Sequence, residues 1–169
     1  VHGIDISRTF IDIARGRSST VTFERGDARA LPFEAEFDAV ICLCQGAFGM
    51  MTADGDDAAV VAGLARSLRP GGRLALSAFN AYFAVKYHDD AEFDARTGVS
   101  HEVTEIRSES GTSRRVDLWT GCYTPRELRL LLGAHGFEVD SISSVEPGAY
   151  RSAPATIESP EFLAIAHIP

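Results

Sequence analysis

The sequence predicts an α/β fold built on a doubly wound, mostly parallel sheet, with an antiparallel final strand and an inserted β-hairpin. Short apolar runs of strand length alternate with stretches of helical periodicity along most of the chain, the order expected for a parallel sheet covered by helices. Residues 89–121 break this alternation, and their own pattern indicates the hairpin. The length of 169 residues and the hydrophobic content of 45% fit a single domain, residues 1–169.

The start of the chain predicts a strand, a helix and a second strand. VHGID at residues 1–5 has the pattern of the end of a strand, and Ser7 is a candidate N-cap for the helix that follows. Gly16 is the expected end of this helix, and residues 21–23 form the next β-like run. The apolar stripe of the helix consists of Phe10, Ile13 and Ala14.

The middle of the chain predicts two strands around a helix. Residues 37–44 are a continuous apolar run, which is typical of a strand covered on both faces. Residues 54–68 have a helical stripe, with aspartates near the positive end of the helix dipole. We interpret these aspartates as a solvated helix start and not as a metal site. Residues 69–72, Arg-Pro-Gly-Gly, end the helix, and residues 73–79 predict another buried strand.

The second half of the chain predicts the hairpin, a helix and two closing strands. A turn at Ser110 and Gly111 divides the hairpin. The next helix runs from its N-cap Thr124 to Gly136, with Pro125 at its first position and Glu127 three residues after the cap. The closing strands cover residues 137–145 and 161–168, and a polar loop from Glu146 to Pro160 separates them.

The composition argues against several classes of partner. A net charge of −8 repels a phosphate backbone, so no nucleic-acid partner is expected. The chain has no apolar run near the roughly 18 residues of a spanning helix and no signal core at its start, which predicts a cytoplasmic protein without a membrane partner. Cys42, Cys44 and Cys122 lack the spacing of a metal site or a disulfide framework, so no metal is expected.

Two aspartates follow neighbouring strands of the predicted sheet. Asp5 ends the first strand that is predicted in this sequence, and Asp27 follows the next predicted strand and Gly26. In a doubly wound sheet, a carboxylate at the end of the second strand accepts hydrogen bonds from the ribose hydroxyls of an adenosine-containing cofactor. A carboxylate in the next loop can accept from the exocyclic amine of adenine. Each aspartate alone has a commoner alternative, Asp5 as a helix-start residue beside Ser7 and Asp27 as a turn residue.

Five motifs, in this order and spacing, carry a resemblance to a known family. GIDIS, GDARALPF, FDAVICL, LRPGGRLALS and YTPRELRLLLGAHGFEV resemble the class I S-adenosylmethionine-dependent methyltransferases from their second strand to their last. FDAVICLCQGAFGM and LSAFNAYF are most similar to small-molecule N-methyltransferases related to the glycine/sarcosine group. The resemblance implies a Rossmann-like fold, S-adenosyl-L-methionine as cofactor and methyl transfer to a small molecule. Phe79 stands where glycine-methylating relatives have an arginine, which argues against a glycine-like acceptor.

The resemblance also implies roles for particular residues. Asp5 binds the ribose, Ile6 packs on adenine, and Asp27 accepts from the adenine amine beside the backbone amide of Ala28. The resemblance identifies no catalytic residue; if the acceptor must lose a proton, His88 and His101 are the candidate bases. Leu43, Cys44 and Gln45 face the methionine half of the cofactor, and the acceptor side, covered by the hairpin, includes Asn80, Tyr82, His101 and Trp119.

One family motif does not occur in these residues. The glycine-rich loop GxGxG, which follows the first strand of the family, is expected upstream of Val1, so that the domain is N-terminally incomplete. In the resembling fold, that first strand lies between the strand ending at Asp5 and the strand at residues 37–44. We therefore expect a gap or an additional strand between these two strands, and direct pairing between them would contradict the fold.

Two other function classes remain open at this point. A dinucleotide-dependent oxidoreductase would use the same carboxylate on ribose, although the Asp27 loop and the final pair of strands argue against it. A non-catalytic module of the same fold would lack the glycine-rich loop because the loop was lost, and not because the sequence is incomplete.

Overall fold

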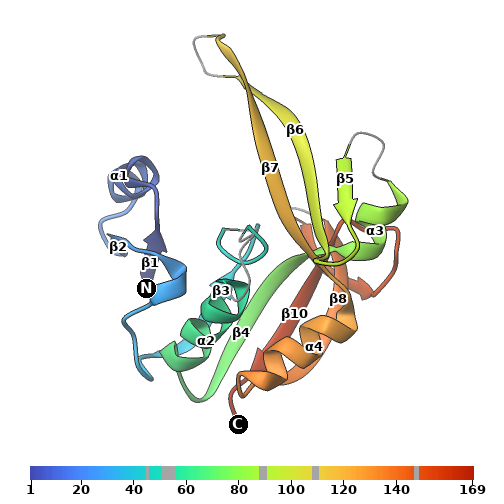
Figure 1. Ribbon diagram of the computed structural model, residues 1–169. Coiled ribbons are helices and arrows are strands. Elements are labelled where there is room, and N and C mark those ends of the chain that lie inside the picture. Colours follow the sequence, from blue (N-terminus) through green and yellow to red (C-terminus); the bar gives the residue numbers. More distant parts are fainter. Residues whose placement is uncertain (45, 51–55, 88–90, 108–110, 147–148) are drawn as a thin grey trace.

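The computed structural model describes residues 1–44, 46–50, 56–87, 91–107, 111–146 and 149–169. The chain begins with β1 (His2–Asp5), α1 (Arg8–Arg17), β2 (Thr22–Arg25) and the 3₁₀ turn η1 (Ala28–Ala30) (Figure 1). It continues with β3 (Phe37–Cys42), α2 (Asp56–Ser67), β4 (Leu68–Asn80), α3 (Ala81–Lys86) and β5 (Ala91–Asp94). The last elements are β6 (Val99–Arg107), β7 (Ser113–Tyr123), α4 (Pro125–Ala134), β8 (Glu138–Glu146), β9 (Ala149–Pro154) and β10 (Glu161–His167).

The larger sheet is mixed. Its strands follow the order β5-β6-β7-β4-β10-β8-β9, and β3 pairs with β4. Strand β3 is parallel to β4, and the end of β7 makes a short parallel contact with β4, whereas the remaining ladders of this sheet are antiparallel. The prediction of a mostly parallel sheet is therefore wrong, because short connections join β5 to β6, β6 to β7 and β8 to β9. The predicted antiparallel final strand is confirmed, since β10 runs against both β4 and β8.

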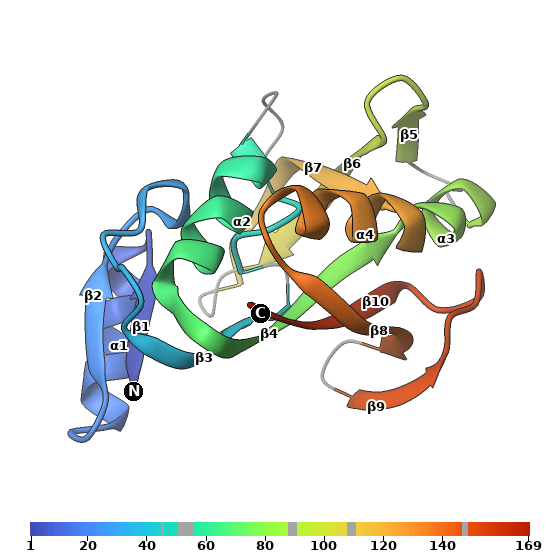
Figure 2. The same cartoon turned by 90° about the horizontal axis from the view of Figure 1, so that it is seen from below.

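Two helices, α2 and α4, cover one face of this sheet (Figure 2). Their buried residues meet the inward residues of β4 and β10 in a single core. The doubly wound arrangement, with helices on both faces, is not seen for the described helices on this sheet. The core residues contributed by these four elements are Val60, Val61, Leu64, Leu74, Leu76, Ala78, Leu128, Leu132, Phe162, Ala164 and Ala166.

Strands β1 and β2 form a separate two-stranded parallel sheet, against which α1 packs. In the described part of the chain, β1 makes no ladder with β3, so the direct pairing that would contradict the fold does not occur. Aromatic side chains connect this small sheet to the rest of the molecule. The ring centroid of His2 lies 5.0 Å from that of Phe33 and 6.4 Å from that of Phe37.

Strand β3 lies at an edge of the larger sheet. Its ladder partner in the described chain is β4, and its residues are half-buried or exposed, with Ile41 72% exposed. The prediction of a strand covered on both faces is therefore wrong. The apolar run shows only which residues β3 contains. Whether a strand is buried on both faces depends on the elements that pack against it, and α2 packs against one face of β3 only.

Several element boundaries differ from the prediction. Helix α1 continues through Gly16 to Arg17 and has Ser18 as its C-cap. Strand β4 begins at Leu68 and includes the Arg-Pro-Gly-Gly segment, in which Gly71 has a φ of +77°. The expected polar loop from Glu146 to Pro160 contains β9. Ser110 of the predicted turn and Asp54 of the predicted helix lie outside the described residues.

Helix α4 follows its prediction closely. Thr124 accepts from the amide of Glu127, and the side chain of Glu127 accepts from the amide of Thr124, which is the predicted capping box. Gly136 follows the helix with a φ of +87°, a conformation that favours glycine. These signals are local, and so the sequence alone suffices to place this helix.

Candidate functional site

The loops that follow β1 and β2 lie side by side. Asp5 is the register partner of Arg25, and the amide of Gly26 donates to the carbonyl of Asp5 at 3.0 Å. A Cβ on Gly26 would lie 2.9 Å from Cγ2 of Ile4, so this close approach requires glycine. The structure therefore brings Asp5 and Asp27 to the same edge of a parallel sheet, as the sequence predicts.

The carboxylate of Asp5 keeps one oxygen open. Oδ1 accepts from the amide of Ser7 at 2.7 Å, and Ser7 caps α1 as predicted. Within the described residues, Oδ2 has no hydrogen-bond partner, which leaves it able to accept from a ligand. The neighbouring Ile6 is 60% exposed, and its carbonyl accepts from Nε of Arg25 at 3.0 Å, which holds the loop on β2.

The carboxylate of Asp27 is paired with Arg29. The guanidinium of Arg29 donates to both oxygens, at 2.7 Å from Nη2 to Oδ2 and 3.0 Å from Nε to Oδ1, and its amide donates to Oδ1 at 2.9 Å. These hydrogen bonds hold the pKa of Asp27 at about 2. Nη1 of Arg29 also lies 3.5 Å from Oδ2 of Asp56, at the start of α2. Asp27 is therefore a charged acceptor throughout the physiological pH range.

Replacing Arg29 with alanine should raise the pKa of Asp27 from about 2 toward the ordinary value of 3.8. Because the folded-state pKa is the lower one, the Asp27 carboxylate contributes stability above pH 3.8 and loses that contribution as the pH falls toward 2. A ¹³C NMR titration of the Asp27 carboxyl carbon measures the midpoint. Arg96→Ala, at the distant turn after β5, is the control that leaves the midpoint unchanged. An Arg29→Ala midpoint that stays near the native one contradicts the pairing.

The loop after β3 contains a strained residue near its start. Cys44 has a φ of +54°, a left-handed conformation that is uncommon for residues other than glycine. Its amide donates to Oγ of Ser77 at 2.9 Å, and its Sγ lies 2.8 Å from the hydroxyl of Tyr150 on β9. Leu43 is half-buried and Cys44 is exposed, while Gln45 lies outside the described residues.

A network that the sequence did not reveal ties this loop to the hairpin. Asp57 of α2 accepts from the amide of Gly49 at 2.9 Å and from the hydroxyl of Tyr123 at 2.5 Å. The amide of Gly121 donates to the carbonyl of Gly49 at 2.7 Å. Burial raises the pKa of Asp57 above its ordinary value, and burial together with Asp57 raises that of Tyr123. The interpretation of the whole acidic cluster as a solvated helix start is therefore wrong for Asp57.

The predicted acceptor-side residues fall into two groups. Asn80 is 1% exposed, and its side-chain amide donates to the carbonyls of Thr156 and Ser159 at 2.9 and 2.8 Å, while Oδ1 accepts from the amide of Tyr82 at 2.9 Å. These contacts give Asn80 a structural role as the N-cap of α3. Tyr82 itself is 47% exposed, and the candidate base His88 lies outside the described residues.

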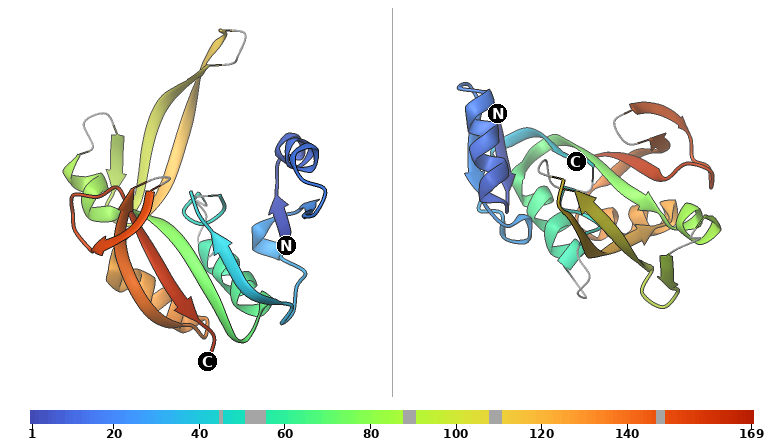
Figure 3. Two further views of the ribbon diagram at one scale, coloured as in Figure 1. Left: turned by 180° about the vertical axis from the view of Figure 1, so that it is seen from behind. Right: turned by 90° about the horizontal axis from the view of Figure 1, so that it is seen from above.

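His101 and Trp119 come together on the hairpin. They are register partners on β6 and β7, and their rings stack with centroids 4.7 Å apart. The hairpin rises on the side of the molecule toward which β1 and β3 run (Figure 3). A position on the opposite side would have excluded the predicted role of the hairpin as a substrate cover.

Two further sequence-based expectations concern metals and membranes. Within the described ranges, no group of three or more His, Cys, Asp or Glu side chains is arranged to hold a metal ion. The same ranges contain no helix that is both long and apolar enough to cross a membrane.

Residues 1–72 match the family model described as a methyltransferase domain. No curated protein gives a significant match.

Solved structures cover the whole chain at low identity. The methyltransferase CcbJ from Streptomyces caelestis has a TM-score of 0.79 at 16% identity, over 99% of this chain and 74% of that one. An S-adenosylmethionine-dependent methyltransferase from Clostridium acetobutylicum has a TM-score of 0.75 at 12% identity, over 99% and 74%. CalS10 from Micromonospora echinaspora, an amino pentose methyltransferase bound to S-adenosylmethionine, has a TM-score of 0.64 at 18% identity, over 100% and 74%.

At these identities, the solved structures establish the α/β methyltransferase fold. The match over residues 1–72, with this fold, confirms the expected enzyme class, a methyltransferase, and the expected cofactor, S-adenosyl-L-methionine.

Proposed function

We propose that this S-adenosyl-L-methionine-dependent methyltransferase methylates a small-molecule acceptor and binds its cofactor at the edge formed by the loops after β1 and β2. The observation that carries the proposal is the pairing of these loops, which brings Asp5 and Asp27 to the same edge of a parallel sheet. Two ribose hydroxyls and an exocyclic amine are hydrogen-bond donors, and an ionised carboxylate is an acceptor only. The carboxyl end of parallel strands is also where ligands bind in open α/β sheets.

The residues at this edge fit an adenosine. Asp5 accepts from the ribose hydroxyls through Oδ2, which is open among the described residues, and the exposed side chain of Ile6 provides an apolar surface for adenine. Asp27 accepts from the adenine amine, and the amide of Ala28, which has no partner in the described part of the chain, donates to the ring edge. In this proposal Leu43 and Cys44 lie toward the methionine half.

The chemistry at such a site is one displacement. When bound, the cofactor supplies a sulfonium methyl group, whose bond to sulfur breaks as the acceptor lone pair attacks it, so that sulfur keeps the electron pair and adenosylhomocysteine remains. The protein contributes alignment and the exclusion of water. A proton released from the acceptor passes to water or to a side chain. Of the two candidate bases, His101 is the one that lies within the described residues.

The class of acceptor is part of the proposal. The amino pentose methyltransferase CalS10 has the same fold as this chain and acts on a small molecule, which supports a small-molecule acceptor here. The closer likeness of FDAVICLCQGAFGM and LSAFNAYF to the glycine/sarcosine group also supports it, with Phe79 arguing against glycine itself. We propose residues 89–121 as the cover of the acceptor site, and the cytoplasmic location stays a prediction.

Adenosylhomocysteine should bind the protein saturably in a calorimetric titration, and NAD⁺ should not. Both ligands contain an adenosine, so that the comparison separates a methyltransferase from the alternative oxidoreductase. Incubation with methyl-labelled S-adenosylmethionine and a panel of small amines and alcohols then identifies the acceptor by mass spectrometry. Tight binding of NAD⁺ with no binding of adenosylhomocysteine would overturn the proposal.

A further inference from the structure

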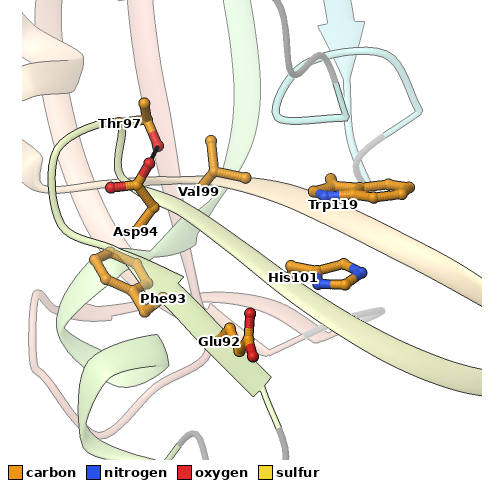
Figure 4. A pocket seen from close by; sticks show the side chains of 7 residues that line it. All are labelled: Glu92, Phe93, Asp94, Thr97, Val99, His101 and Trp119. Carbon is orange, nitrogen blue, oxygen red and sulfur yellow. Dashed lines mark hydrogen bonds between the residues drawn. The ribbon is translucent and has the colours of Figure 1, made fainter.

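A cavity of about 490 Å³ lies at the base of the hairpin. Its walls come from β5, β6, β7 and the turn between β5 and β6 (Figure 4). Figure 4 shows the rings of Trp119 and His101 on one side and Phe93, Asp94 and Val99 on the other. The lining residues are Glu92, Phe93, Asp94, Thr97, Val99, His101 and Trp119.

The register of the strands explains why these side chains share one face. Glu92 pairs with His101, and His101 pairs with Trp119, so that the three form one row across β5, β6 and β7. Asp94 pairs with Val99 in the next row of the same face. Side chains two residues apart on a strand point to the same side, and this periodicity collects two carboxylates and two aromatic rings around one space.

The aromatic wall is held in place. The rings of His101 and Trp119 are stacked at an interplanar angle of 15°. Nε2 of His101 lies 2.9 Å from Oδ1 of Asp117, so that this carboxylate fixes the orientation of the imidazole. Trp119 is 45% exposed, and its indole is therefore accessible to a ligand.

The charge around the cavity is negative. Glu92 and Asp94 line it, and Asp117 lies behind His101. Hydrogen bonds from the amide of Arg96 and the hydroxyl of Thr97 hold the pKa of Asp94 below its ordinary value, so that its carboxylate is charged. The guanidinium of Arg96 is 3.8 Å from Asp94 but 87% exposed, and it is therefore a weak competitor for this charge.

We propose that this cavity binds a positively charged amine group of the methyl acceptor, with Glu92 and Asp94 as counter-charges and Trp119 and His101 as an aromatic wall. Carboxylates attract an ammonium group, and aromatic rings bind its alkyl substituents by cation–π attraction and apolar contact. This inference rests on the proposed function and adds the substrate class to it. Glu92, Asp94 and Trp119 thereby become determinants of specificity.

Choline chloride tests the proposal, with 3,3-dimethyl-1-butanol as its neutral isostere. Trp119 is the only tryptophan in the sequence, so that intrinsic indole fluorescence reports on this cavity alone. Choline should change the fluorescence saturably, relative to sodium chloride at equal concentration. The affinity for the neutral isostere should be lower than the affinity for choline, by up to about fivefold. Equal affinity for the two probes, or no saturable change with choline, overturns the proposal.

Two matched variants locate the effect. Glu92→Gln should weaken choline binding by about threefold. Glu102→Gln makes the same change of charge on the opposite face of β6, one residue from His101, and should leave the affinity unchanged. Both positions border solvent, and circular dichroism checks that the variants keep the fold. An effect of Glu102→Gln equal to that of Glu92→Gln would mean that choline binds outside the cavity.

A final titration separates this inference from the proposed function. Choline and adenosylhomocysteine should bind together, because an acceptor and a cofactor occupy different sites. Displacement of choline by adenosylhomocysteine would overturn the acceptor role of the cavity while leaving the cofactor site intact. Binding of choline without any binding of adenosylhomocysteine would instead overturn the proposed function, and the acceptor role of the cavity with it.

Discussion

Asp5→Ala should weaken the binding of adenosylhomocysteine at least tenfold. Each hydrogen bond to a charged group contributes roughly 1.5 to 3 kcal/mol, and about 1.4 kcal/mol corresponds to a factor of ten in affinity. Asp5 faces two ribose hydroxyls in the proposed site, whereas Asp27 faces one amine. We therefore expect Asp27→Ala to have the smaller effect. Isothermal titration calorimetry measures both affinities.

The controls for this prediction separate ligand binding from local structure. Asp5→Ala also removes the acceptor of the Ser7 amide, but Asp5→Asn keeps a side-chain oxygen for that bond and replaces the other oxygen with a donor. Asp5→Asn should therefore lose most of the affinity and keep α1 intact. Asp12→Ala removes an exposed carboxylate from α1 and should bind normally. Unchanged affinity in both Asp5→Ala and Asp27→Ala would remove the cofactor assignment.

Phe162→Ala should lower the free energy of unfolding by about 3 to 5 kcal/mol, the range typical for truncating a buried aromatic side chain. Phe162 is 1% exposed and lies on β10, between β4 and β8, beneath the helices of the core. Because domains are stable by only roughly 5 to 15 kcal/mol, this loss would shift the urea midpoint strongly.

The matched control is Leu130→Ala on α4. Leu130 is 65% exposed, and surface substitutions of this kind change stability by about 0.5 kcal/mol or less. Urea unfolding followed by far-UV circular dichroism compares the two variants. A loss below about 1 kcal/mol for Phe162→Ala would contradict the central position of β10 in the sheet.

The contacts of Asp57 connect the two halves of the proposed reaction. Its carboxylate joins Gly49 to Tyr123 at the base of the hairpin. Gly49 lies in the loop after Leu43 and Cys44, the two residues that we propose lie on the cofactor side. Phe48 stacks on Tyr123 with ring centroids 4.8 Å apart, beside this network. The hairpin with its cavity and the loop after β3 are therefore held by one set of partly buried hydrogen bonds, which connects the proposed cofactor and acceptor sides.

The sequence by itself determined the elements whose signals lie within a few residues. Helix α4 was predicted from its capping box and the glycine that follows it, and the structure has both. The positions of Asp5 at the end of β1 and of Asp27 after β2 were likewise predicted, because the end of a strand and the turn after it are marked by neighbouring residues. Parallel pairing of two such strands then brings Asp5 and Asp27 to the same edge of the sheet.

Only the tertiary structure decided which side chains are covered and which partners they find. The apolar run of β3 does not show that Ile41 is exposed, and the aspartates at the start of α2 do not show that Asp57 meets a tyrosine 66 residues later in the chain. The sequence places Asn80 on the predicted acceptor side, but it does not show that the side-chain amide of Asn80 holds the loop before β10. Burial and hydrogen-bond partners depend on contacts between residues distant in sequence, and the local pattern of a single chain carries no record of them.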